Sequence, residues 1–289
     1  ARDHLSGDGV VVGVADTGLD VESCYFRDAS FDWTRLRDGD FTSRPALPEA
    51  EFIYNARTET QRHAKLEQLC LFYPHYADKE LWDGQGHGTH CAGSVAGNAP
   101  SASAAVQNGM AFNAKLAVAD VAPNGYDGIY PPVPFEVKVL GAAHRDAGAR
   151  LHSNSWGSSS NTVYGGNSFD VDEYSYQNQD FLVFIAAGND GRTGAETIGS
   201  PAICKNAVTV GATLNDGSDV RDFSSRGPTF DGRIGVDVCA PGSSIDSAAI
   251  APALGRTVGT ATCGSSRMSG TSMATPITAG GAGPPPGGT

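Results

Sequence analysis

The sequence has little charge and no long hydrophobic run. Charged residues make up 18% of its 289 residues, and the acidic ones outnumber the basic ones, so the net charge is −12. This balance disfavours nucleic acid or an anionic membrane as a partner. The longest apolar stretch, FLVFIAA at 181–187, has the length of a strand and is too short to span a bilayer. We therefore expect a globular protein with neither kind of partner.

Recognisable targeting and glycosylation signals are also missing. The first residues, ARDHLSGDG, have no hydrophobic region after the arginine, so they do not resemble a signal peptide. No Asn-x-Ser/Thr sequon occurs. We expect the chain to begin as a mature or excised domain.

The cysteines lack the spacing of a metal site. Six occur, at positions 24, 70, 91, 204, 239 and 263, without a Cys-x-x-Cys pair or a Cys/His cluster. Structural zinc is therefore disfavoured. Two or three disulfides in a secreted protein are predicted instead, with their pairing left open.

What the chain does contain is a series of short, β-branched runs that end in small or polar residues. Continuous apolar strands of this kind suit a parallel sheet that is covered on both faces. Helix-compatible stretches at 87–97 and 135–148 lie among them. The prediction is one α/β domain over 1–289, with three layers: a mostly parallel central sheet and helices on both faces. The predicted strand regions are 9–18, 114–121, 181–190 and 206–213.

Residues 24–86 interrupt this pattern. They are polar, rich in Arg and Asp, and only weakly periodic. We interpret them as a long surface insertion, with Cys24 and Cys70 as candidates for a disulfide at its base. Loops of this length are usually functional or locally folded. The position just before a helix that begins with His87 favours a role in shaping a substrate cleft.

Four polar residues stand at the ends of the predicted elements. Asp16 ends the first strand, His87 opens a helix, Asn189 ends a later strand and Ser272 opens the last helix. In open parallel sheets, ligands bind outside the carboxyl ends of the strands. We therefore expect these four side chains to converge at one edge of the sheet.

Together, the four side chains supply what acyl transfer needs. A serine hydroxyl requires a base to take its proton, and neutral imidazole has a suitable pKa. A carboxylate fixes the imidazole tautomer and stabilises the imidazolium as it forms. The backbone N–H of Ser272 and the side-chain amide of Asn189 could stabilise the oxyanion.

Several motifs, in order, resemble the subtilisin family of serine endopeptidases, the subtilases. The resemblance covers nearly all of the chain. VADTGLD resembles the family's Asp motif, GHGTHCAGSVAG its His motif and GTSMATP its Ser motif. SNSWGS resembles the substrate-binding strand and AAGN the oxyanion segment, while FSSRGPT and APG resemble the framework before the nucleophile.

The resemblance implies a role for each candidate residue of a catalytic site. Asp16 would orient the base, His87 would be the base, Ser272 the nucleophile and Asn189 the oxyanion donor. The function implied is a serine endopeptidase that cleaves proteins or peptides through an acyl-enzyme.

The resemblance also implies the substrate-binding residues. Ser155, Trp156 and Gly157 would form a strand that pairs with the extended substrate backbone. Small residues would wall the pocket for the side chain before the scissile bond, which favours broad specificity. These pocket residues are Ala186, Ala187 and Gly188.

Further expectations follow from the resemblance. The chemistry needs no cofactor. Structural calcium is expected, but no Asp-rich loop has a ligand pattern from which its site could be assigned. A pro-segment acting as chaperone and inhibitor is an expected partner. The expected location is secreted or extracellular, with a vesicular or lysosome-like compartment as the alternative. Some subtilases carry a mercury-sensitive cysteine at the position of Cys91, which we interpret here as a free, inert, buried thiol.

Two other functions remain open. A catalytically inactive subtilase-fold scaffold would bind peptides through 155–157 without cutting them. A metal-dependent hydrolase would use His87 and His90, which lie three residues apart. The sequence has neither an HExxH glutamate nor an evident third ligand, so His90 is expected to be a buried structural histidine and no metal site is assigned.

The last ten residues, GGAGPPPGGT at 280–289, do not fit a long nucleophile helix. An interior glycine costs about 1 kcal/mol and a proline about 3 kcal/mol relative to alanine. We therefore predict that this tail is not helical. A fragment and an erroneous chain end are favoured as explanations over a genuine variant with a differently closed core.

Overall fold

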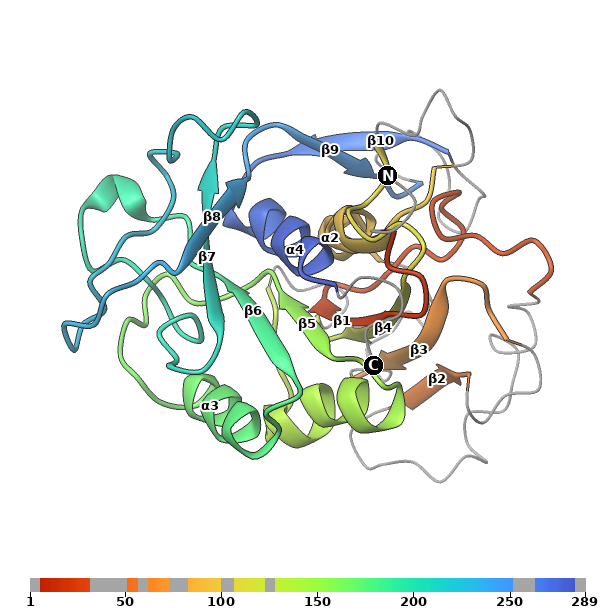
Figure 1. Cartoon of the computed structure of the whole chain (residues 1–289), viewed down its shortest axis with the longest axis horizontal. Coiled ribbons are helices and arrows are strands. Elements are labelled where there is room, and N and C mark those ends of the chain that lie inside the picture. The colour runs from red at the N-terminus through yellow and green to blue at the C-terminus, as the bar shows by residue number, and fades with distance from the viewer. Residues whose placement is uncertain are drawn as a thin grey trace.

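The computed structural model describes residues 6–31, 51–56, 62–72, 83–99, 107–122, 128–251 and 263–283 (Figure 1). Within these residues, one sheet has the strand order β2-β3-β4-β1-β5-β6-β7-β8. Its pairs are parallel except for β2 with β3. The strands are β1 Val11–Asp16, β2 Glu51–Asn55, β3 Leu66–Leu71, β4 Lys115–Asp120, β5 Leu151–Asn154, β6 Leu182–Ala186, β7 Val208–Thr213 and β8 Val238–Pro241.

Helices cover both faces of this sheet (Figure 1). On one face, α2 (His87–Ala96) packs against α4 (Thr271–Gly281), with the antiparallel hairpin of β9 (Ile245–Ala248) and β10 (Ser265–Met268) beyond them. On the other face lie α3 (Asn167–Gln177) and two π-helical segments, η2 (Glu136–Leu140) and η3 (Ala142–Asp146). A short 3₁₀ turn, η4, spans Gly191–Thr193. The predicted three-layer α/β architecture is confirmed.

Each face of the sheet has its own core. Side chains alternate along a strand, so Val12 and Val14 of β1 join the core beneath α2 and α4, whereas Ala15 joins the core on the α3 side. All three are at most 1% exposed. A strand buried on both faces reads as a continuous apolar run, which explains why β1 and β4 were recognisable in the sequence.

Part of the predicted surface insertion belongs to the sheet. Residues 66–71 form β3, which pairs in parallel with β4 through an irregular register, and Leu66 and Leu69 are almost fully buried. The interpretation of 24–86 as a surface insertion is therefore wrong for β3 and for β2, which pairs with it at the edge of the same sheet. Glu and Gln between the leucines of β3 hid that strand. Residues 32–50, 57–61 and 73–82 of this stretch lie outside the described residues.

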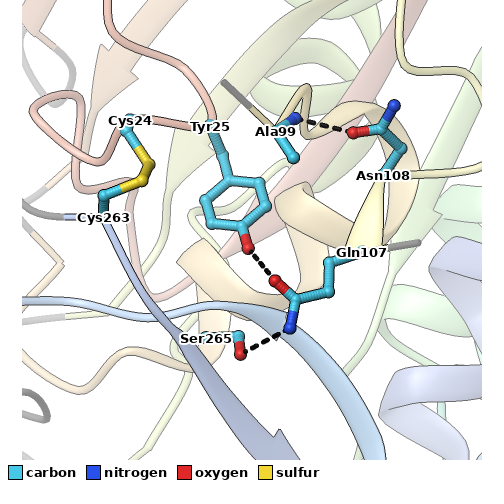
Figure 2. The surroundings of a disulfide bond; sticks show 7 residues. All are labelled: Cys24, Tyr25, Ala99, Gln107, Asn108, Cys263 and Ser265. Atoms are coloured by element: carbon cyan, nitrogen blue, oxygen red, sulfur yellow. Dashed lines mark hydrogen bonds between the residues drawn. A yellow bond between two sulfur atoms is a disulfide. The ribbon is translucent and has the colours of Figure 1, made fainter. Parts of the chain in front are cut away.

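The disulfide predictions are also corrected. One disulfide, Cys24–Cys263, is present (Figure 2). The other four cysteines, which all lie in the described part of the chain, are free, so the expectation of two or three disulfides is wrong. A Cys24–Cys70 bridge is excluded because Cys24 packs against the core under α2 and α4, whereas Cys70 is buried in the core of the opposite face.

The last helix runs further than predicted. Gly280 and Gly281 still belong to α4, and only residues 284–289 of the tail lie outside the described part of the chain. A Cβ atom at Gly280 would lie 2.9 Å from Met110 Cβ and 3.0 Å from the carbonyl oxygen of Val95. A glycine at this position therefore lets α4 pack closely on α2, which offsets its poor helix propensity.

The helices are short. The longest in the described part of the chain have 11 residues, and none there is long and apolar enough to cross a membrane.

Candidate active site

The four predicted catalytic residues come together at the carboxyl ends of the strands. Asp16 is the last residue of β1, and His87 is the first residue of α2. Asn189 follows β6, and Ser272 lies in the first turn of α4. His87, Asn189 and Ser272 line one cavity of about 740 Å³. Asp16 lies behind His87 and is fully buried.

Asp16 and His87 form a short hydrogen bond. His87 Nδ1 lies 2.6 Å from Asp16 Oδ1, which also accepts the backbone N–H of Thr17 at 2.8 Å. A carboxylate can only accept, so the Nδ1 proton of His87 points at Asp16 and Nε2 is left to act as a base. The imidazole is 30% exposed, which keeps it within reach of a ligand.

Two opposing effects, burial and the charge of Asp16, set the pKa of His87. Burial of the imidazole lowers its pKa, but the adjacent Asp16 carboxylate, through its charge and its hydrogen bond, raises it. The net effect holds the pKa of His87 well above its usual 6.5. A histidine with this environment becomes a fully available base only on the alkaline side of its ordinary range.

Ser272 is held by reciprocal hydrogen bonds with Ser155. The Ser272 hydroxyl donates to the Ser155 carbonyl at 2.9 Å, and the Ser155 hydroxyl donates to the Ser272 carbonyl at 2.9 Å. These bonds join the first turn of α4 to the segment that follows β5. The hydroxyl thus rests on Ser155 in this structure and has to rotate before it can reach an imidazole.

The amide of Asn189 has a defined orientation. Its Oδ1 accepts the backbone N–H of Thr271 at 2.9 Å and the Thr271 hydroxyl at 3.1 Å. An oxygen that takes both donors leaves the two N–H groups of Nδ2 available for another acceptor. The Ser272 backbone N–H belongs to the first turn of α4, where amides lack intrahelical partners. Both features suit binding of an anion.

All six predicted substrate-binding residues line the same cavity, namely Ser155, Trp156, Gly157, Ala186, Ala187 and Gly188. Trp156 is half-buried and packs edge-on against Phe135 at a ring-centroid distance of 5.4 Å. It therefore belongs both to the cavity wall and to the rim of the core.

Sequence reasoning missed several small, uncharged residues of the cavity. A Cβ atom at Gly199 would lie 1.9 Å from the Ser158 carbonyl oxygen, so only glycine fits there. Most of these residues come from loops without apolar periodicity, while Asn167 opens α3, and only their tertiary contacts reveal them. The additional uncharged lining residues include Ser158, Asn161, Gly165, Asn167, Gly199 and Ser200.

Comparison with known proteins agrees with this geometry. The model of the subtilase family matches residues 7–283. The chain belongs to the subtilase family. It is 32% identical over 233 residues to the serine protease/ABC transporter B family protein tagB of Dictyostelium discoideum, covering 76% of this chain and 11% of that protein.

Two further matches define the fold and extent of this subtilase. It is 32% identical over 279 residues to serine protease AprX of Bacillus subtilis (strain 168), covering 83% of this chain and 60% of AprX. The solved structure of sphericase matches with a TM-score of 0.58 and 26% identity, over 95% of this chain and 76% of that one. The fold is therefore subtilisin-like, and the chain spans only part of the length of tagB and AprX.

Two further residues of α2 in this subtilase, His90 and Cys91, are buried in the interior of the fold. His90 is fully buried, and its Nε2 bonds the Ile245 carbonyl at 3.0 Å, which confirms the prediction of a buried structural histidine. Cys91 is free and buried; its Sγ lies 3.8 Å from His87 Nδ1 and donates to the Ser272 carbonyl at 3.4 Å. Burial raises the pKa of this thiol, so it remains protonated near neutral pH.

One group of potential metal ligands occurs in the described part of the subtilase. The ligand atoms of Asp16, His87 and Cys91 lie within 4.8 Å of one another. This mixture of oxygen, nitrogen and sulfur does not fit calcium, which prefers oxygen ligands only. Structural calcium stays a prediction without an assigned site.

Two buried residues near His87 were not singled out by the sequence. Asp83 and Thr17 are hydrogen-bonded to each other at 2.9 Å and both contact the start of α2. An aspartate four residues before a histidine that opens a helix, as in DGQGH, was the available signal.

Proposed function

We propose that this chain is a serine endopeptidase that hydrolyses peptide bonds through an acyl-enzyme on Ser272. The observation that carries the proposal is the 2.6 Å hydrogen bond between Asp16 and His87 beside a cavity that Ser272 and Asn189 also line. Family membership supports it, because tagB and AprX are both named as serine proteases.

The reaction begins when the Ser272 hydroxyl turns from the Ser155 carbonyl toward His87. His87 Nε2 takes the hydroxyl proton as Oγ attacks the scissile carbonyl, and Asp16 stabilises the resulting imidazolium. The carbonyl electrons move onto oxygen, where the Asn189 amide and the Ser272 backbone N–H donate hydrogen bonds. The C–N bond then breaks as the imidazolium protonates the leaving amine.

Water completes the cycle. His87, neutral again, takes a proton from a water molecule that attacks the acyl-enzyme, and the second tetrahedral species collapses to release the carboxylic acid and restore the serine hydroxyl. No cofactor enters these steps.

The proposed substrates are extended segments of proteins or peptides. Their backbone would pair with Ser155, Trp156 and Gly157, which follow β5 at the cavity wall. The side chain before the scissile bond would enter the cavity beside Ala186, Ala187 and Gly188, where small residues favour broad specificity.

The proposal includes a biological setting. We propose a secreted or extracellular enzyme, consistent with a disulfide that persists in oxidising compartments, and a pro-segment as its folding partner and inhibitor. Structural calcium is part of the same proposal, without an assigned set of ligand residues.

An inactive peptide-binding scaffold is the second candidate. The observation that favours it is the Ser272 hydroxyl, which donates to Ser155 rather than to His87 in this structure. The two candidates agree on peptide binding and differ only in hydrolysis.

Peptide cleavage distinguishes the two candidates. The parent chain and its Ser272→Ala variant are each incubated with a library of peptides of varied sequence, and new amino termini are counted by mass spectrometry. The endopeptidase proposal expects cleavage by the parent alone, with a loss of roughly 10⁶-fold in the variant. Equal peptide binding without cleavage by either protein would establish the scaffold instead.

A further inference from the structure

The helix that carries His87 begins without a capping side chain of its own. Gly86 occupies the N-cap position in a left-handed conformation, with φ 84°. The first amides of a helix have no intrahelical acceptor, and burying them unpaired is costly. Since Gly88 and Thr89 are both buried, their N–H groups need acceptors from elsewhere in the fold.

Two side chains from outside the helix accept these amides. The Gly88 N–H donates to Thr17 Oγ1 at 2.8 Å, and the Thr89 N–H donates to Asp83 Oδ2 at 2.8 Å. Asp83 Oδ1 also accepts the N–H groups of Gln85 at 3.0 Å and Gly86 at 2.8 Å. The Asp83 carboxylate thus accepts backbone N–H groups both from the turn that precedes α2 and from the first turn of the helix.

Thr17 links this turn to Asp16. Its hydroxyl donates to Asp83 Oδ1 at 2.9 Å while accepting from Gly88, and its own N–H donates to Asp16 Oδ1. Thr17 is the residue after Asp16, and Gly88 is the residue after His87. The Thr17–Gly88 bond therefore joins the immediate neighbours of the two residues that form the 2.6 Å bond.

The two elements approach each other closely at this point. A Cβ atom at Gly88 would lie 2.3 Å from the Gly18 carbonyl oxygen and 3.0 Å from the Thr17 nitrogen. Thr17 lies at the wall of the cavity but is only 6% exposed, and Asp83 is only 2% exposed, so little of either side chain is open to water. The contact between the end of β1 and the start of α2 is therefore close and largely buried.

We propose that Thr17 and Asp83 are positioning residues that set the geometry of the Asp16–His87 hydrogen bond. They do so by holding the first turn of α2 against the end of β1. This inference rests on the proposed function for its kinetic readout and adds two residues to the proposed machinery. Neither residue touches the reacting atoms; both act through His87.

A purely structural role would predict a different outcome. A buried cap that only stabilises the fold lowers the unfolding temperature when it is removed, but it leaves the folded enzyme with parental kinetics. A positioning role also changes the chemical step, because an imidazole displaced by about 1 Å can cost roughly 100-fold in rate.

The experiment compares Thr17→Val, which removes the hydroxyl, with Thr17→Ser, which keeps it. Asp83→Asn replaces one acceptor oxygen by a donor. Thr213→Val is the matched control. Thr213 is 7% exposed, its hydroxyl donates to the Leu214 carbonyl at 2.9 Å, and it lies outside the cavity lining. We measure kcat and KM separately, the pH profile and the unfolding temperature of each protein.

The expected result is a loss of about 10- to 100-fold in kcat for Thr17→Val and Asp83→Asn, with KM nearly unchanged. The acid limb of the pH–rate profile should move toward pH 6.5, because a longer or weaker hydrogen bond to Asp16 raises the pKa of His87 less. Thr17→Ser should retain the parental values. Thr213→Val should change the unfolding temperature alone.

A second readout does not depend on hydrolysis. The pKa of His87 can be measured by NMR in Ser272→Ala protein. It should be lower when Thr17→Val is combined with Ser272→Ala, and unchanged when Thr17→Ser is combined with it. Folded Thr17→Val protein with the parental pKa and kcat would overturn the inference, as would equal losses in Thr17→Ser. A parent that never hydrolyses peptide contradicts the proposed function, while the NMR titration still decides the role of Thr17.

Discussion

At the scale of single residues, the proposed chemistry needs one charge beside one imidazole. Asp16 is fully buried, while His87 is partly exposed to the cavity, so the imidazole is open to a ligand and the carboxylate is kept from water. The motifs around these residues predicted that they would lie together because the chemistry needs fixed residue types. Thr17 and Asp83 could not be identified in the same way, since threonine and aspartate near a turn are common and only tertiary contacts distinguish them.

The raised pKa of His87 has a consequence for the pH profile. Protonated imidazole cannot take the serine proton, so kcat/KM should rise as the pH increases through the pKa of His87, with a midpoint above 6.5. Asp16→Asn removes the main cause of the shift. Its acid limb should move to lower pH and its rate should fall roughly 10⁴-fold, as measured with a chromogenic peptide between pH 5 and 9. An unchanged limb in the variant would show that another group controls His87.

The proposed oxyanion donor gives a second prediction at this scale. Asn189→Ala removes the Nδ2 donor and should lower kcat by about 10²- to 10³-fold with little change in KM, because the hydrogen bond forms mainly in the transition state. Asn189 also holds Thr271, so Thr271→Val serves as the control for displacement of α4. If steady-state kinetics show the same loss in both variants, Asn189 acts through α4 and not on the oxyanion.

At the scale of elements, the sequence predicted best where strands are buried on both faces. The runs at 9–18, 114–121, 181–190 and 206–213 contain β1, β4, β6 and β7. The predicted strand regions left out β2, β3, β5 and β8, and polar residues interrupt the apolar run in both β3 and β5. The sequence also indicated a regular helix over 135–148, where the structure has π-helical turns. Strand pairing and helix geometry of this kind depend on neighbours that a local pattern does not contain.

The end of α4 tests whether its glycines are there for packing. Gly280→Ala should destabilise the protein by about 1–3 kcal/mol, since its new Cβ would meet Met110 and the Val95 carbonyl at 3.0 Å or less. Gly281→Ala is the matched control: its nearest contact would be 3.8 Å, so it should be neutral or gain up to about 1 kcal/mol of helix propensity. Urea unfolding of both variants measures the difference. Equal effects would argue against close packing of α4 on α2.

At the scale of the whole molecule, a single covalent link joins distant parts of the chain. Cys24–Cys263 connects the segment after β1 with the residues just before β10, across a sequence separation of 239 (Figure 2). Beside it, Tyr25 donates to Gln107 Oε1 at 2.7 Å, and Gln107 Nε2 donates to Ser265 at 3.1 Å. The link therefore reinforces a contact that side chains already make between three segments. The sequence revealed the cysteines but not their partners, because pairing depends on which face of the sheet each one occupies.

Removing this disulfide should have a large effect on stability. Closing a loop of this length stabilises by roughly 5 kcal/mol in the chain-entropy model. The Cys24→Ser/Cys263→Ser double variant should thus unfold at a much lower guanidinium midpoint. Cys239→Ser, which alters a free and exposed cysteine, should not. A double variant with the parental midpoint would mean that the side-chain contacts alone hold these segments together.

The most direct test of the central claim is active-site titration of the 289-residue chain with a fluorescent peptidyl phosphonate, followed by mapping of the labelled peptide. We expect stoichiometric labelling on Ser272, lost in Ser272→Ala and slowed at pH values below the pKa of His87, since only the neutral imidazole activates the hydroxyl. Folded protein that stays unlabelled at every pH, or carries the label on another residue, would contradict the central claim.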